Sequence, residues 1–348
     1  MINYTANPSR ATNYKIDKTK KNILLIGAGS NAARSKMILN PASVETAKML
    51  YGENSELAKS YEHAFNITND INIFTVNCPL FTDYIEIIDT ITQYDFDFIV
   101  PISVNLRDTF FNPLINKTIS LVAYYLQKLK LSDNNSILII SDYSSTLYDD
   151  IDDYIDDMEN VFSTFEANNS DTLNVCGNNL IFVLNNFIEE VKSNVILAAS
   201  LSKIDFVSYP ASTKFKTYMD LDKHDIQNKS FCFYKYHHSA GFSSIEQLNN
   251  CKYTNDIYKQ VIIDLLVKHV VKALDLSEFN GTLYNPYVQI KIETKVNKVM
   301  DSLSNCFVSY KVKNVGFYTT DIGVGTIIVD ISIVPHSLLE TINIIMEL

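Results

Sequence analysis

The chain has 348 residues, of which 47% are hydrophobic and 20% charged, so it can bury substantial cores in about two domains. Its 29 basic and 40 acidic side chains give a net charge of −11, which disfavours binding to nucleic acid or to an anionic membrane. Only Arg10, Arg34 and Arg107 could make the bidentate contacts of nucleic-acid readers, so we expect protein partners.

The five cysteines are far apart and form neither a CxxC pair nor a Cys/His cluster at zinc spacing. They are typical of buried thiols in a reducing compartment. The N-terminal residues lack the apolar segment of a secretory signal, and no window contains the roughly 18 apolar residues that span a bilayer. We expect a protein made in a cytoplasm, without a metal, another cofactor or a membrane anchor.

Residues 1–21 are polar, with too few apolar positions for a core, and are predicted to form an extended N-terminal arm. Over residues 22–250, short apolar runs alternate with helical stretches. The runs are NILLIG (22–27), INIFTV (71–76), FDFIVPIS (96–103), SILIIS (136–141) and NVILAAS (194–200). Runs buried on both faces predict an α/β domain with a mostly parallel sheet.

The strand at 22–27 leads into GAGSNA (27–32), which matches the GxGxxA pattern of dinucleotide-binding folds. Such folds carry an acidic residue about 20 positions later, at the end of the second strand. Glu45 and Glu53 have this spacing but lie in helical sequence, and the next strand starts only at Ile71. We interpret the glycines as a tight strand-to-loop turn, with a nucleotide-binding or dinucleotide-binding enzyme as the alternative.

Two later stretches have helical periodicity. The stretch 43–66 is predicted to be helical with a break at Tyr51-Gly52. The stretch 149–162 is very acidic, but it lacks the glycine of an EF-hand calcium loop. Its apolar residues recur at helical spacing, so its carboxylates are predicted to form the wet face of an amphipathic helix. These apolar residues are Ile151, Tyr154, Ile155, Met158 and Phe162.

Residues 251–340 are predicted to form a C-terminal α+β domain in which antiparallel strands follow two helices. The helices are expected at 258–276 and 285–306, and the strands at 307–318 and 325–335. The inner face of the second helix is expected to hold Ile292, Val296, Val299 and Leu303.

Lys291, Lys295 and Lys298 recur at i, i+4 and i+7 along the second helix, inside an otherwise acidic chain. Lys311 and Lys313 follow on the next strand. The stripe is either a solvated face or a docking surface for an acidic partner, in which case it would set orientation and register.

The last eight residues, TINIIMEL, alternate as a strand does. Ile342, Ile344, Met346 and Leu348 share one face, and Thr341, Asn343, Ile345 and Glu347 share the other. Chain ends fray unless something holds them. An apolar strand at the terminus therefore requires a partner strand, in this subunit or in another.

No pattern of a catalytic nucleophile, zinc protease or phosphate loop is present. The adjacent His237 and His238 would point to opposite faces of a strand, and His269 lies in an apolar helix. We assign His237 and His238 to a structural or surface role and His269 to the core, and expect no enzymatic activity.

Taken together, the last hundred residues resemble the C-terminal region of contractile tail sheath proteins of bacteriophages and related phage-tail-like particles. The matching order is the helix 258–276, the loop EFNGTLYNP (278–286), a helix ending in MDSLSNC, the strand FVSYKVKN (307–314) and the closing segment 325–348. Upstream, NILLIGAGSNA, LYGENSELAKSYEHAF and TQYDFDFIVPIS are similar to the family's opening strand, a helix and a further strand.

This resemblance implies a structural subunit of stacked hexameric rings around a tail tube, which contracts to drive the tube through a cell envelope. It implies that residues 341–348 are exchanged with a neighbouring subunit, and that Thr5, Tyr14 and Ile16 make strand contacts in the N-terminal arm. In this family the C-terminal domain faces the tube, so Lys291, Lys295 and Lys298 become candidate tube contacts.

The implied partners are further copies of the chain, the tail tube protein, and the baseplate and tail terminator proteins. The implied location is the virion tail, assembled in the host cytoplasm. Another tail or baseplate subunit is a second alternative, beside the nucleotide-binding enzyme.

Overall fold

The computed structural model describes the ranges 21–30, 35–67, 71–94, 96–132, 136–188, 191–202, 212–217, 231–237, 242–246, 285–304, 307–319 and 325–335, together with 266, 269–270 and 273–274. The chain divides into two compact units. Unit 1 comprises Met1–Ile204 and Tyr209–Tyr258, and unit 2 comprises Asp205–Ser208 and Lys259–Leu348. The domain boundary predicted at 250/251 lies outside the described residues and stays a prediction.

Unit 1 is built on a six-stranded sheet with the order β2-β3-β1-β4-β7-β8. Its strands are β1 (Asn22–Gly27), β2 (Ile38–Leu39), β3 (Asn72–Asn77), β4 (Phe98–Pro101), β7 (Ile137–Ser144) and β8 (Leu180–Asn185). All neighbouring strands are parallel except β2, which runs antiparallel to β3. Every residue of β1, β4 and β8 is buried, as expected for strands covered on both faces. The mostly parallel sheet is thus confirmed.

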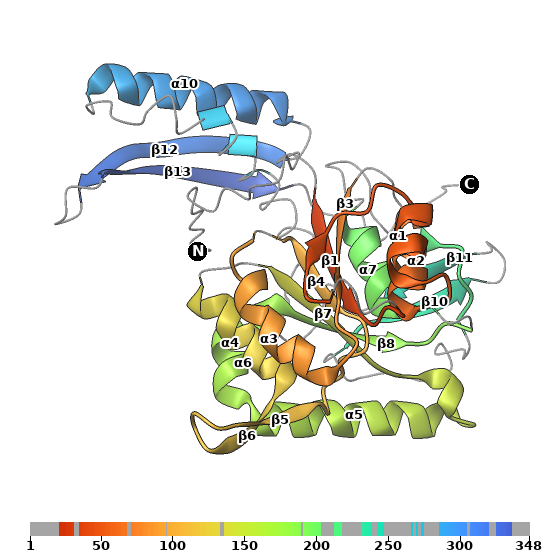
Figure 1. The fold of residues 1–348 in the computed structure, drawn as a ribbon. Coiled ribbons are helices and arrows are strands. Elements are labelled where there is room, and N and C mark those ends of the chain that lie inside the picture. The colour runs from red at the N-terminus through yellow and green to blue at the C-terminus, as the bar shows by residue number, and fades with distance from the viewer. Residues whose placement is uncertain are drawn as a thin grey trace, which may run out of the picture. The chain divides into compact units, whose positions relative to one another are not determined.

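Helices cover both faces of this sheet (Figure 1). One face carries α1 (Val44–Tyr51), α2 (Glu56–Ile67) and α7 (Ser193–Ser202). The other carries α3 (Phe81–Ile91), α4 (Leu121–Leu131), α6 (Ser170–Cys176) and the long α5 (Ile151–Asn168). Short 3-10 turns, η2 (Ser145–Leu147) and η3 (Gly177–Asn179), precede α5 and β8.

The break predicted at Tyr51-Gly52 is confirmed, because α1 ends at Tyr51 and α2 begins at Glu56. Gly52 has a φ of 88°, and its N–H donates to the Lys48 carbonyl oxygen at 2.9 Å. A glycine adopts this backbone conformation without the steric cost of a side chain. The helix predicted at 149–162 is also confirmed, and as α5 it continues to Asn168.

The strand predicted from NVILAAS (194–200) is wrong, because these residues lie in the helix α7. Every residue of α7 is buried, so the sequence has no polar face that would reveal a helical period. A short run that is apolar all round cannot be assigned to helix or strand by periodicity alone. The edge strand beside β7 is β8, with the sequence LIFVLN, which the sequence analysis missed.

Two smaller sheets complete unit 1. An antiparallel hairpin of β5 (Thr109–Asn112) and β6 (Lys117–Ser120) lies between β4 and α4 in the chain. A three-stranded antiparallel sheet has the order β10-β11-β9. Its strands are β9 (Ser212–Thr213), β10 (Phe233–His237) and β11 (Phe242–Glu246).

In unit 2 the described elements are α10 (Pro286–Ser302) and the antiparallel strands β12 (Phe307–Thr319) and β13 (Gly325–Pro335). The second predicted helix and the two predicted strands are thus confirmed. Leu266, His269 and Val270 are helical, within the apolar helix predicted at 258–276. Most of that helix lies outside the described residues.

Candidate functional site

The candidate functional surface of unit 2 is carried by α10, and the sequence Asn285-Pro286 fixes where this helix begins. The Asn285 Oδ1 atom accepts hydrogen bonds from the backbone N–H groups of Tyr287 and Val288, each at 3.0 Å. Pro286 occupies the first turn, where a missing N–H leaves no helical hydrogen bond unmade. The defined start determines which side chains of α10 face outward.

The inner face of α10 is a stripe of apolar residues at a spacing of four: Val288, Ile292, Val296 and Met300. These residues form the core of unit 2 with Leu266 and Val270. Partly buried apolar side chains pack around this core, namely Leu274, Val299, Leu303, Tyr310, Val312, Val329 and Ile331. The predicted inner-face residues therefore lie in or beside the core, which orients the rest of the helix outward.

A hydrogen bond joins the end of α10 to the hairpin. The hydroxyl of Tyr310, on β12, donates to Asp301 Oδ1 at 2.6 Å. This bond to a carboxylate favours the protonated phenol and raises the pKa of Tyr310 above its ordinary value. The hairpin and the helix are thus connected by a polar contact as well as by the apolar core.

The structure places all three predicted lysines on one side of α10. Lys291 and Lys295 are half-buried beside the core, and Lys298 is exposed. Tyr287 and Ile290, which the sequence analysis missed, are exposed on the outer side of the same helix. Tyr287 precedes Lys291 by four residues, so helical spacing predicts that Tyr287 lies on the same side of the helix as the lysines. The outer side of α10 therefore combines positive charge with exposed apolar area.

The β12–β13 hairpin presents two backbone edges. The strands pair from Phe307 opposite Pro335 to Thr319 opposite Gly325, with register shifts between Phe307 and Ser309 and between Val312 and Asn314. Among the described residues, each of these strands pairs only with the other. A strand with an unpaired edge can accept a strand from another chain.

The predicted exchange strand 341–348 and the predicted arm contacts Thr5, Tyr14 and Ile16 lie outside the described residues. They stay predictions. The side chain of Lys313 is also outside the description, whereas Lys311 is exposed on β12.

The glycine-rich loop after β1 is held by protein groups. Gly29 N–H donates to Asn77 Oδ1 at 2.8 Å, and Ser30 N–H donates to the Tyr51 carbonyl oxygen at 2.6 Å. A Cβ atom at Gly29 would lie 3.1 Å from the Tyr51 Cβ atom. A dinucleotide fold aims such N–H groups at a pyrophosphate. Here they bind strand β3 and helix α1, which favours the interpretation as a structural turn.

At the carboxyl ends of the sheet strands, polar side chains from three segments of the chain contact one another. The Ser103 hydroxyl donates to the carboxylate of Glu56, and Lys192 Nζ lies 3.3 Å from Glu56 Oε1. This is the edge at which open α/β sheets bind ligands. In this chain side chains from α2, the loop after β4 and the start of α7 bind one another there.

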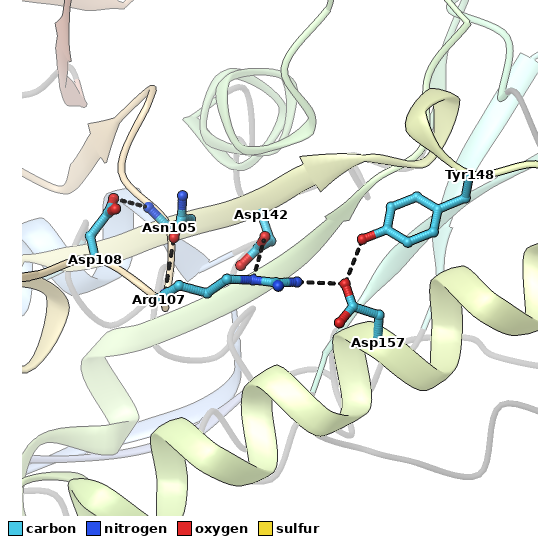
Figure 2. A network of polar contacts seen from close by, with 6 residues as sticks. All are labelled: Asn105, Arg107, Asp108, Asp142, Tyr148 and Asp157. Carbon is cyan, nitrogen blue, oxygen red and sulfur yellow. Dashed lines mark hydrogen bonds and ion pairs between the residues drawn. The ribbon is translucent and has the colours of Figure 1, made fainter.

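Figure 2 shows an ionic network around Arg107, in the segment between β4 and β5. Arg107 Nη2 lies 2.6 Å from Asp157 Oδ2 on α5, and Arg107 Nε lies 3.5 Å from the buried Asp142 Oδ1 on β7. The Tyr148 hydroxyl donates to Asp157 Oδ2 at 2.5 Å. Burial opposes ionisation of Asp157, but the bonds from Tyr148 and Arg107 prevail and lower its pKa.

The described residues contain no group of three or more His, Cys, Asp or Glu side chains that could hold a metal ion. Among the helices that the structure describes, none combines the length and apolar content needed to cross a bilayer.

No protein-family model and no curated protein matches the chain. Solved structures match it over nearly the whole of both chains. A chain of the anti-feeding prophage baseplate has a TM-score of 0.62 at 11% identity, covering 100% of this chain and 98% of that chain. A chain of the anti-feeding prophage helical sheath in the contracted state has a TM-score of 0.60, with the same identity and coverage. The sheath tail protein from Listeria innocua has a TM-score of 0.59 at 7% identity, covering 94% of each chain.

The chain has the fold of contractile tail sheath proteins. The tail sheath fold spans both units, since the matches cover the full chain. The resemblance read from the last hundred residues is confirmed at the level of the fold. The sheath proteins in this comparison share this fold with the chain at identities of only 7% and 11%.

Proposed function

We propose that the chain is a structural subunit of a contractile tail sheath. In this proposal it forms hexameric rings that stack around a tail tube and contract to drive the tube through the envelope of a target cell. The observation that carries the proposal is the full-length likeness to a chain of a helical sheath in the contracted state. The subunit would belong to a virion tail or a related particle and would assemble in the host cytoplasm.

Strand exchange would connect the subunits. The outer edges of β12 and β13 are suitable acceptors, because β13 is 11 and β12 is 13 residues long, enough to pair with an eight-residue strand. We assign residues 341–348 to one such strand and the N-terminal arm, with Thr5, Tyr14 and Ile16, to another. Both strands would come from neighbouring copies.

The outer side of α10 would bind the tail tube protein. Lys291, Lys295 and Lys298 supply positive charge for an acidic tube surface, and the exposed Tyr287 supplies apolar contact area. Baseplate and tail terminator proteins would bind the two ends of the sheath.

No nucleotide is required, because the energy for contraction would be stored during assembly and released as subunits rotate into better contacts. The packing of Gly29 and Ser30 against Asn77 and Tyr51 supports this proposal over a dinucleotide-binding enzyme. The matched chains come from baseplate and sheath particles rather than from enzymes.

Electron microscopy of the purified, overexpressed chain tests the proposal. A sheath subunit should polymerise into hollow tubes, whereas a baseplate component should form closed or isolated particles. Spherical or monomeric material under all conditions would contradict the proposal. A rise in melting temperature with NAD or ATP would favour the enzyme instead.

A further inference from the structure

The β5–β6 hairpin of unit 1 carries an exposed apolar tip. Phe111 on β5 is 58% exposed, and Leu114 and Ile115, in the turn between the strands, are 93% and 58% exposed. A hairpin of two short strands has little stability by itself, so it depends on contacts with the rest of its domain. The anchorage at the base of the hairpin therefore determines how firmly the tip is held.

Two contacts join this base to α4, the helix that directly follows β6 in the chain. The rings of Phe110 on β5 and Tyr124 on α4 pack edge to face, with centroids 5.2 Å apart. The Leu121 N–H donates to the Asp108 carbonyl oxygen at 2.9 Å. Both contacts are local in sequence, and they hold the hairpin to α4.

Arg107, two residues before β5, reaches two elements that are distant in sequence (Figure 2). Its Nη2 atom lies 2.6 Å from Asp157 Oδ2 on α5, and its Nε atom lies 3.5 Å from Asp142 Oδ1 on β7. The guanidinium is a rigid planar fork with several donors, so it can contact two carboxylates at once. Arg107 therefore couples the base of the hairpin to α5 and β7.

The backbone around Arg107 is itself held by side chains. Asn105 Oδ1 accepts a hydrogen bond from the Arg107 N–H at 3.0 Å, and Asp108 Oδ2 accepts one from the Asn105 N–H at 2.9 Å. Val104 and Leu106, on either side of Asn105, are buried. Because the segment is ordered in this way, Arg107 loses little backbone freedom when it contacts α5.

Four ionisable groups surround the Asp157 carboxylate. They are Arg107, Tyr148, the buried Asp142 on β7, and Tyr154 one turn earlier on α5. Arg107 is shared between two carboxylates, and the Tyr148 hydroxyl donates to Asp157 Oδ2 at 2.5 Å. The contact between the hairpin base and α5 therefore depends on the charge of Asp157.

Asp157 and Asp108 respond to acid with opposite signs. Burial opposes ionisation of Asp157, but the bonds from Tyr148 and Arg107 lower its pKa, so its stabilising charge is lost as the pH falls through the folded value. Burial raises the pKa of Asp108, so protonation of Asp108 favours the folded state. Asp157 is thus the group of this pair whose protonation weakens the network.

We propose that Arg107 is a clasp that couples the β5–β6 hairpin to α5 and β7, and that acid opens the clasp by protonating Asp157. With the clasp closed, the hairpin and its apolar tip move together with α5. With the clasp open, the hairpin stays attached to α4, and its tip moves independently of α5. The inference concerns unit 1 alone and does not depend on the proposed sheath function.

Hydrogen exchange in the unpolymerised full chain measures the coupling. Arg107→Gln should raise the exchange rates of the β5 and β6 amides by about tenfold and leave those of β1 nearly unchanged, because only the clasp is lost. The control is Lys48→Gln, which removes a partly exposed ion pair with Glu62 at 2.9 Å between α1 and α2. It should leave hairpin exchange unchanged. Equal acceleration of the hairpin and β1 by Arg107→Gln would indicate a general loss of stability and overturn the proposal.

A double variant separates the clasp from simple compensation of charge. Removal of Arg107 takes a positive charge away from the buried Asp142, which is costly for the fold. Arg107→Gln with Asp142→Asn avoids that cost and serves as the test if the single variant does not fold. Its hairpin exchange should still be about tenfold faster, because the bond to Asp157 is missing. Hairpin exchange at the unaltered rate in this variant would overturn the clasp.

An acid titration tests the role of Asp157. In the unaltered chain, hairpin exchange corrected for the intrinsic effect of pH should rise about tenfold as the pH falls below about 4, while β1 stays protected. Asp157→Asn should show the faster exchange already at neutral pH, without a further step in acid. Asp156→Asn, at an exposed position of α5, and Asp108→Asn should both keep the acid step. An acid step that persists in Asp157→Asn, or disappears in Asp108→Asn, would overturn the assignment.

Discussion

At the residue scale, the loop after β1 is shaped by the groups that it contacts. Gly27 accepts a backbone hydrogen bond from Cys78 at 2.9 Å, and Ala28 accepts one from Leu57 at 3.1 Å. A Cβ atom at Gly27 would lie 2.9 Å from the Ile102 Cδ1 atom, so the glycine permits a close approach of two chain segments. The glycines therefore serve the packing of unit 1.

Replacement of Gly52 by alanine should destabilise unit 1. The φ of 88° at the end of α1 is a conformation that side chains rarely adopt, and a Cβ atom there would lie 3.0 Å from the Ser30 Cβ atom. We expect Gly52→Ala to lower the free energy of unfolding by about 1–3 kcal/mol, measured by urea denaturation of unpolymerised protein. Asn54→Ala, at an exposed position in the same turn, should have little effect, and equal losses in both variants would contradict this account.

Replacement of Asp157 by asparagine should alter the pH dependence of stability. The pKa of Asp157 is lowered in the folded chain, so its contribution is present above the ordinary pKa of about 4 and is lost as the pH falls through the lower folded value. We expect Asp157→Asn to cost about 1 kcal/mol at neutral pH, because the carboxylate is partly exposed. The variant should lack part of the loss of stability that the unaltered chain shows below pH 4. The control is Asp156→Asn, exposed on the same helix, whose profile should match the unaltered chain.

At the element scale, α10 has two sides with different roles. Its buried stripe holds the β12–β13 hairpin, and its outer side presents Lys291, Lys295 and Lys298 beside exposed Tyr287. None of the three lysines belongs to the buried stripe, so we expect that their charge can change without loss of the helix. This separation makes the proposed tube contact testable.

Replacement of the three lysines by glutamine should weaken binding of the chain to tail tube protein by about tenfold, because charge complementarity is lost. Pelleting of tubes with bound chain at several salt concentrations measures this effect, and the unaltered chain should lose affinity as salt rises. Replacement of Lys59, Lys130 and Lys214 removes the same charge from unit 1 and should leave binding intact. Equal weakening in both triple variants would point to net charge instead of the α10 surface.

At the scale of the whole molecule, the tail sheath fold contains an α/β unit with buried strands and a smaller unit whose strands β12 and β13 pair, among the described residues, only with each other. Unit 1 has a core that is complete by itself, since its parallel strands are covered on both faces. The outer edges of the β12–β13 hairpin of unit 2 are the sites at which we propose strand exchange. Stability of the subunit and its capacity to polymerise should therefore be separable.

Deletion of residues 341–348 should leave a chain that folds but does not form tubes, because the exchanged strand is missing. Circular dichroism and the melting temperature should match those of the full chain, and electron microscopy should show no tubes. Tubes built from chains that lack 341–348 would show that this strand is not the connector.

The sequence by itself determined the elements that have a clear hydrophobic period. Strand β1, the break at Gly52, helix α5 and strands β12 and β13 follow from apolar residues at spacings of two or of three and four. The spacing of Lys291, Lys295 and Lys298 likewise determined that they share one side of α10. Local patterns of this kind depend only on backbone geometry.

Only the tertiary structure decided what fully buried segments become. NVILAAS in α7 and LIFVLN in β8 are both buried at every residue, so the choice between helix and strand depends on the space left beside β7. The role of the glycine loop was decided in the same way, by Asn77 and Tyr51, which are distant in sequence and occupy its N–H groups. Long-range packing determines these features. A segment that is buried on every side has no polar face, so its sequence shows no periodicity that would distinguish a helix from a strand.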